Sequence, residues 1–135
     1  MSDARVILKP RRAGPSFGRH PWVFTGAVAK IEGEPAPGES VAVQSDRGEF
    51  IAYGLLSRKS SLAVRLYSWD IDRPICEELL AERLQAAIRM RQELGLANPR
   101  GACRLVFSEG DGLSGLIVDR WGDVVVLQIG SAALL

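Results

Sequence analysis

The stretch Arg19–Phe24 (RHPWVF) gathers residue types that can bind an anionic partner. It holds His20, the only histidine of the chain, together with Trp22 and Phe24, and it follows a basic run of Lys9, Arg11 and Arg12. Basic side chains neutralise phosphates, and exposed aromatic rings stack on unpaired bases. The same residues can instead begin a helix that packs on a core, with Pro21 in the first turn. Both interpretations of His20 stay open at this point.

The basic residues are distributed unevenly. The chain has 17 basic and 16 acidic residues, yet residues 1–30 carry six basic side chains and one acidic side chain. Residues 74–135 carry six basic and eight acidic side chains. A basic end on a nearly neutral chain indicates a local anionic partner, or else a solvated face that binds nothing. A second basic pair, Arg58-Lys59, lies in a Ser-rich loop and can extend the same surface.

Size and composition favour a globular protein. The 135 residues are 47% hydrophobic and 24% charged, which fits one ordinary domain or two small ones. There is no apolar run of 18 residues, so we expect no transmembrane helix, and the N-terminus lacks the apolar region of a signal peptide. Cys76 and Cys103 form no CxxC pattern, which favours reduced thiols in a cytoplasmic protein.

Residues 1–70 are typical of a small β domain. A short helix is expected from Pro21 through Phe24, and a hairpin turn at Ser45–Gly48, with a bulge at Gly54. The aromatic side chains of Trp22 and Phe24 are expected to fill the core of this domain rather than to stack on bases. Strands are expected at Arg5–Lys9, Ala27–Ile31, Val41–Val43, Phe50–Leu56 and Leu62–Tyr67.

The second half begins with a long amphipathic helix over residues 74–94. Its apolar stripe contains Cys76, Leu80, Leu84, Ala87 and Ile88. Its charged residues Glu82, Arg83, Arg89 and Arg91 lie mostly off that stripe. Strands are expected at Arg104–Phe107, Leu113–Val118 and Val124–Ile129, and residues 131–135 favour the start of a helix. This half looks incomplete, so we expect a truncated chain.

One motif suggests a cofactor, but its context does not support one. Gly110–Gly115 (GDGLSG) matches GxGxxG after a strand, although a nucleotide site needs the last glycine to open a helix. Here a strand-like run, LIV, follows, so a turn is expected. Glu109 and Asp111 are assigned a structural role. Neither a metal site, given a single histidine, nor a Ser-His-Asp triad is expected.

Two stretches resemble a known family. Residues 19–28 (RHPWVFTGAV) and residues 104–123 (RLVFSEGDGLSGLIVDRWGD) are similar to two signatures of the bacterial large-subunit ribosomal RNA cytosine-5 methyltransferases of the RlmI type. The order and separation of the two stretches also fit, and the resemblance covers essentially the whole chain. The sequence departs from the family at Ser114, where proline is expected, which would loosen the turn.

The resemblance implies an α+β fold in two parts. Residues 1–72 would be a PUA-like β pseudo-barrel that binds RNA. Residues 73–135 would be a long helix and an incomplete antiparallel β unit of an α/β central domain. The family's catalytic domain, which binds S-adenosylmethionine, would be absent, so this chain alone would have no catalytic residue and no cofactor. Neither cysteine lies in a matching motif, so neither inherits the nucleophile role.

The sequence thus predicts the RNA-binding region of a ribosomal RNA methyltransferase. Its partner would be ribosomal RNA rather than a membrane. The alternatives are a structural module that forms a homodimer and, less favoured, an enzyme that uses the Gly110–Gly115 loop. Arg19 and His20 enter the candidate site by matching the family motif, and the others enter by charge. The candidate RNA-binding residues are Lys9, Arg11, Arg12, Arg19, His20, Arg58 and Lys59.

Overall fold

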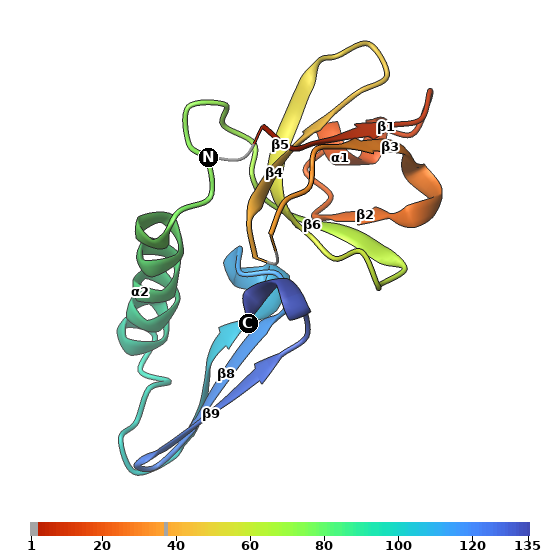
Figure 1. The fold of residues 1–135 in the computed structure, drawn as a ribbon. Helices are drawn as coiled ribbons and strands as arrows, with labels where there is room; N and C mark the ends of the chain where they lie inside the picture. The colour runs from red at the N-terminus through yellow and green to blue at the C-terminus, as the bar shows by residue number, and fades with distance from the viewer. Residues whose placement is uncertain (1–2, 37) are drawn as a thin grey trace. The chain divides into compact units, whose positions relative to one another are not determined.

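The chain divides into two compact units. A computed structural model describes residues 3–36 and 38–135. Unit 1 comprises Met1–Ile75 with Ala132–Leu135, and unit 2 comprises Cys76–Ser131. The division falls three residues after the predicted limit at residue 72. The last four residues belong to unit 1, and nothing in the sequence indicated their return to it. The elements of both units confirm the predicted α+β class, and Figure 1 labels the two α-helices and most of the strands.

Unit 1 is built on a curled, mainly antiparallel sheet. Its described residues form a six-stranded sheet in the order β2-β6-β5-β4-β1-β3, in which only the described β1–β4 pair is parallel. The 3-10 helix η3 (Ala132–Leu134) contacts β5. The strands are β1 (Arg5–Leu8), β2 (Trp22–Phe24), β3 (Val28–Glu32), β4 (Ser40–Gln44), β5 (Phe50–Leu56) and β6 (Leu62–Ser68), with helices α1 (Gly14–Phe17) and η1 (Thr25–Ala27) between them.

Alternating apolar residues of these strands fill one core. Val6, Val41, Val43 and Val64 are completely buried, and each is flanked along its strand by a more exposed residue on at least one side. Side chains alternate between the two faces of a strand, so this pattern directs one face inward. Val23 of β2 joins the same core. The pattern explains why the sequence indicated a barrel-like β domain.

The helix predicted from Pro21 through Phe24 is wrong, because Trp22–Phe24 form an edge strand that Pro21 precedes. Val23 pairs with Val64 of β6, and the Leu66 N–H donates a 2.7 Å hydrogen bond to the Pro21 carbonyl. Proline is tolerated at the start of an edge strand as well as in the first turn of a helix, so its position was ambiguous. The helix of this region instead comes earlier, at Gly14–Phe17.

The bulge predicted at Gly54 is confirmed. The register between β5 and β6 shifts between Tyr53 and Gly54. A β-carbon on Gly54 would lie 2.8 Å from the Arg65 carbonyl oxygen and would also collide with the Val64 side chain. The two strands therefore approach each other so closely that only glycine fits between them.

Unit 2 packs one long helix against a sheet. Helix α2 (Glu77–Glu93) begins three residues later than predicted, with Cys76 as its N-cap. The predicted stripe is confirmed for Ala87, which is buried in the core, and for Leu80, Leu84 and Ile88, which pack against it. In the described part of the chain the sheet has the order β7-β8-β9, from β7 (Ala102–Phe107), β8 (Leu116–Trp121) and β9 (Val124–Ile129).

Strand β9 is apolar and exposed. All six of its residues are exposed, and five of them are Val124, Val125, Val126, Leu127 and Ile129. It lies at one end of the sheet order, paired with β8. An exposed apolar edge strand is a template for pairing with another chain.

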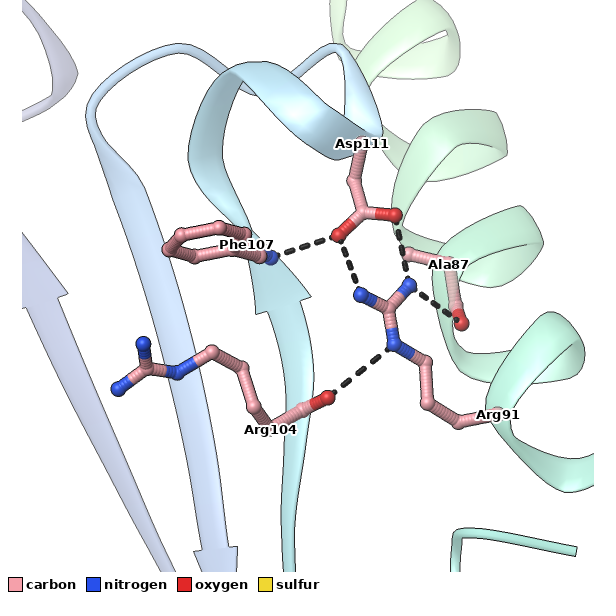
Figure 2. A network of polar contacts seen from close by, with 5 residues as sticks. All are labelled: Ala87, Arg91, Arg104, Phe107 and Asp111. Atoms are coloured by element: carbon pink, nitrogen blue, oxygen red, sulfur yellow. Dashed lines mark hydrogen bonds and ion pairs between the residues drawn. The ribbon is translucent and has the colours of Figure 1, made fainter.

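An ion pair fastens the turn after β7 to helix α2 (Figure 2). The Arg91 guanidinium donates two hydrogen bonds, of 2.6 and 2.8 Å, to the Asp111 carboxylate, and Asp111 also accepts a 2.6 Å bond from the Phe107 N–H. Arg91 further donates to the Ala87 and Arg104 carbonyls. Burial opposes the ionisation of Asp111, but the bonds from Arg91 and Phe107 outweigh it and hold the pKa of Asp111 below its ordinary value.

The glycine-rich loop is a structural turn, as predicted. Gly112 adopts a left-handed conformation, and the last glycine of the motif, Gly115, leads into strand β8 rather than into a helix. The Ser114 hydroxyl, buried where the family pattern has proline, donates a 2.6 Å hydrogen bond to the Glu109 carboxylate. The expected loosening of the turn is therefore offset by this bond.

Replacing Gly54 tests the close approach of β5 and β6. Gly54→Ala should lower the free energy of unfolding by about 1–3 kcal/mol, because the added methyl group forces the strands apart. Gly14→Ala is the matched control, since a β-carbon on Gly14 meets nothing within 4 Å. Urea unfolding of both variants measures the difference. Equal stability of the two variants would contradict the close approach.

Neutralising Asp111 tests the ion pair in unit 2. Asp111→Asn should cost about 3 kcal/mol at neutral pH, because it leaves the Arg91 guanidinium without its charged partner. The folded-state pKa of Asp111 is lowered, so its contribution is complete above the unfolded value of about 4 and is lost as the pH falls through the folded value. The stability gap between the two proteins should therefore close in acid.

Asp119→Asn is the control for this comparison. Asp119 also accepts two hydrogen bonds from one guanidinium, that of Arg104, but this pair is exposed to solvent. Exposed ion pairs contribute little to stability. Thermal unfolding from pH 2 to pH 8 compares the two variants, and equal losses at pH 7 would contradict the account.

Candidate nucleic-acid interface

Hydrogen bonds hold helix α1 and the turn that follows it in place within unit 1. Ser16 is buried, and its carbonyl accepts a 2.7 Å bond from the indole N–H of Trp69. The N–H groups of Arg19 and His20 donate to the carbonyls of Ser16 and Pro15, at 3.1 and 2.9 Å. The backbone that carries Arg19 and His20 is therefore fixed by the same helix that packs on Trp69.

Two of the predicted RNA-binding residues have an unusual backbone. Arg11 and Arg19 both have φ of 64°, in the left-handed region that favours glycine. Among residues 3–36 and 38–135, Ser108 is the only other non-glycine residue with a positive φ. A side chain in this conformation costs about 1–2 kcal/mol per residue. Such strain occurs at functional sites, but Ser108 in the turn of unit 2 shows it as well, so the backbone alone assigns no role to Arg11 or Arg19.

Three exposed rings follow one another, that of His20 just before β2 and those of Trp22 and Phe24 on the strand. His20 and Trp22 have ring centroids 5.8 Å apart at an interplanar angle of 81°, and Trp22 and Phe24 are 6.3 Å apart at 88°. Trp22 is 38% exposed and Phe24 is 49% exposed, so the prediction that both fill the core is wrong. Strand alternation is the reason, because it sends Val23 inward and its two neighbours outward. We call His20, Trp22 and Phe24 the aromatic ladder.

The aromatic ladder borders a depression of about 440 Å³. Arg12 and His20 line this depression together, so the structure brings two of the predicted residues to one place. Among the described residues that line it there is no aspartate or glutamate. Its lining is completed by Pro15, Ser16, Trp22, Val23, Phe24, Gly26 and Ala27. An uncharged or cationic surface of this kind suits an anionic ligand.

The other predicted residues lie elsewhere on unit 1. Arg11 lines a separate depression together with Arg47, Asp46 and Glu49, so that two basic and two acidic residues share it. Arg58 and Lys59 line a third, next to Pro35 and Ala36. Lys9 and Arg19 are exposed but are not among the residues that line the depression at the aromatic ladder. The seven predicted residues therefore do not form one cluster.

Sequence reasoning did not select one cation that the fold places beside the aromatic ladder. Arg65 of β6 is directly opposite Trp22 in the antiparallel pair. Opposite residues of such a pair project from the same face of the sheet. Because Trp22 and Arg65 are 43 residues apart in sequence, the pairing gives no local signal. Two basic residues thus accompany the aromatic ladder. Arg12 lines the same depression, and Arg65 lies opposite Trp22 in the strand pair.

Lys30 provides a contrast on the opposite edge of the sheet. Its ammonium lies 2.5 Å from the Glu32 carboxylate, and their hydrogen bond holds the pKa of Glu32 below its ordinary value. A cation engaged in this way is a weak competitor for phosphate. Lys30 is therefore a suitable control among the basic residues of the first thirty positions, because it lies outside the candidate interface.

Neither a metal nor a cofactor site is formed by the residues described. No three His, Cys, Asp or Glu side chains gather as a metal site requires within residues 3–36 and 38–135. At the GxGxxG loop, a β-carbon on Gly112 would lie 3.3 Å from Arg83, whose guanidinium donates to the Gly112 carbonyl. Arg83 of α2 therefore packs against the loop at Gly112, and the loop leads into β8 rather than into the helix that a nucleotide site requires. None of the described helices has the length and apolar character that a membrane crossing requires.

Comparisons with known proteins match this architecture. Residues 6–69 match the model of the PUA-like domain. The chain is 40% identical, over 95% of its length, to ribosomal RNA large subunit methyltransferase I of Erwinia tasmaniensis, and 36% identical, over 96%, to the protein of that name in Escherichia coli (strain SE11). It covers 32% and 33% of those proteins. The chain thus spans about a third of the length of these curated relatives.

Solved structures show the same fold at low identity. A proposed SAM-dependent methyltransferase from Streptococcus mutans matches with a TM-score of 0.77 at 16% identity, over 96% of this chain and 34% of that one. A proposed methyltransferase complexed with SAH matches with the same TM-score at 18% identity, over 99% and 34%. Residues 6–69 therefore match a PUA-like domain, and the resemblance of the chain to the large-subunit ribosomal RNA methyltransferases of the RlmI type is confirmed over 95% of its length.

Proposed function

We propose that this chain is the RNA-binding region of a cytoplasmic, S-adenosylmethionine-dependent ribosomal RNA (cytosine-C5) methyltransferase. The observation that carries the proposal is the depression of the PUA-like domain that Arg12, His20 and the exposed rings of β2 surround. Phosphates would be neutralised by basic side chains of unit 1, with residues 1–72 acting as the RNA-binding domain. The names of the curated relatives support ribosomal RNA as the partner.

In this proposal the chain binds and positions RNA but does not react with it. The GxGxxG loop is filled by its contacts to α2, so the methyl donor would be held by residues outside this chain. Cys76 and Cys103 are free thiols, and neither lies in the depression at the aromatic ladder. Unit 2 would join the RNA-binding domain to the part of the enzyme that carries out the transfer.

Salt dependence tests RNA binding. The 135-residue chain should bind a labelled ribosomal RNA fragment with an affinity that falls as salt rises, because phosphate contacts release counterions. Arg12→Ala should weaken binding and reduce the slope of log affinity against log salt by about 1. Lys30→Ala is the matched control and should change neither quantity. Fluorescence anisotropy at four salt concentrations measures both. Binding without salt dependence would contradict the proposal.

Arg19→Gly separates binding from folding. Glycine adopts the left-handed conformation of Arg19 without steric cost, so this variant should be as stable as the parent or up to about 1 kcal/mol more stable. It should nevertheless bind the RNA fragment more weakly, because a cation is lost. Thermal unfolding and anisotropy on the same sample measure the two effects. Full RNA affinity in a stabilised Arg19→Gly variant would remove Arg19 from the interface.

Self-association is a second candidate function, and the exposed apolar residues of β9 favour it. A second copy that pairs with β9 would cover Val124, Val125 and Val126. Light scattering over a hundredfold range of concentration should then show a dimer, and Val125→Lys should restore the monomer. A monomer at the highest concentration would contradict this candidate and would leave RNA binding unaffected.

A further inference from the structure

We propose that the aromatic ladder stacks on the unpaired bases of single-stranded RNA, while Arg12 holds the adjacent backbone. This inference rests on the proposed RNA-binding function and specifies its ligand. In this inference Trp22 and Phe24 distinguish single-stranded from duplex RNA. The sequence predicts that both side chains lie in the core, but both are exposed.

The position of the rings on an edge strand makes them accessible. β2 lies at one end of the sheet order, and Val23 anchors it in the core while Trp22 and Phe24 project outward. Both large rings border the same depression as Arg12. The two rings are therefore exposed on an edge strand, where a base can approach them.

The angles between the rings select bases that are not stacked on one another. Successive rings of the ladder are nearly perpendicular, at 81° and 88°. An intact helix presents parallel bases at a spacing of 3.4 Å, which perpendicular rings cannot continue. Bases that are splayed apart can each lie on a separate ring, as single-strand-binding surfaces require.

A hydrogen bond orients His20 for a polar contact at the end of the ladder. The Trp22 N–H donates to Nδ1 of His20 at 3.3 Å. In the neutral ring Nδ1 is then the acceptor, so Nε2 carries the proton and is a donor. That donor lies next to the rings and suits an acceptor on a base edge or a phosphate oxygen.

Charge favours RNA over a protein as the ligand of the ladder. The lining of the depression has Arg12 and His20, and the described residues that line it include no carboxylate. Arg65 is opposite Trp22 across the strand pair. By contrast, the depression at Arg11 combines Arg11 and Arg47 with Asp46 and Glu49. The exposed residues of β9 are almost all apolar. Rings combined with cations match bases joined by phosphates.

The test compares single-stranded and duplex RNA on the full 135-residue chain. The probes are a labelled 12-nucleotide single strand of mixed sequence and the duplex that it forms with its complement. Trp22→Leu should weaken single-strand binding about tenfold, the loss of one stacked base, while duplex binding and the salt slope stay nearly unchanged. Trp22→Phe should retain most of the affinity, because it keeps a ring face. Phe24→Leu should show a smaller loss of the same kind.

The controls separate this inference from the function on which it rests. Trp121→Leu removes an exposed tryptophan of unit 2 and should change nothing. Arg12→Ala should weaken both RNA forms. If the parent binds neither RNA, the proposed function and this inference both fail. If the parent binds RNA with salt dependence but Trp22→Leu binds the single strand equally well, only the stacking role fails. Self-association that Trp22→Leu abolishes without RNA would assign the ladder to a protein contact instead.

Discussion

The pairing of β2 with β6 is the constraint on which the candidate interface depends. Val23 lies opposite Val64, and both are buried in the core of unit 1. That register leaves Trp22 and Phe24 no place inside, because neighbouring side chains of a strand point to opposite faces. A shift by one residue would bury the two rings and expose Val23. The solvent exposure of the Trp22 and Phe24 rings therefore follows from the packing of Val23 in the core.

The elements around β2 fix the geometry of the surface at a cost in backbone strain. Trp69 holds α1 through the Ser16 carbonyl, and the turn that follows carries Arg19 in a left-handed conformation. In unit 2 the buried ion pair of Arg91 and Asp111 has a structural role, because it holds the turn after β7 against helix α2. Arg19 therefore carries backbone strain close to the exposed rings, while the buried ion pair of Arg91 and Asp111 stabilises the fold of unit 2.

Much of the fold was predictable from sequence because its signals are local. The hairpin at Ser45–Gly48, the bulge at Gly54 and the apolar stripe of α2 all follow from turn chemistry and periodicity. The features that the sequence did not predict depend on contacts between residues far apart in the chain. Pro21 suits a helix start and an edge strand equally, and only pairing with β6 decides between them. Arg91 lies off the apolar stripe, so its partner Asp111, twenty residues away, gave no sign in the pattern.

The indole N–H resonances of the three tryptophans test the display of the β2 rings most directly. Trp22 belongs to the ladder, the Trp69 indole is bonded to Ser16, and Trp121 is 62% exposed in unit 2. Titration of the isotope-labelled chain with the single-stranded RNA should shift the Trp22 resonance strongly and leave those of Trp69 and Trp121 nearly in place. An unchanged Trp22 resonance at saturating RNA, or an equal shift of Trp121, would contradict the account.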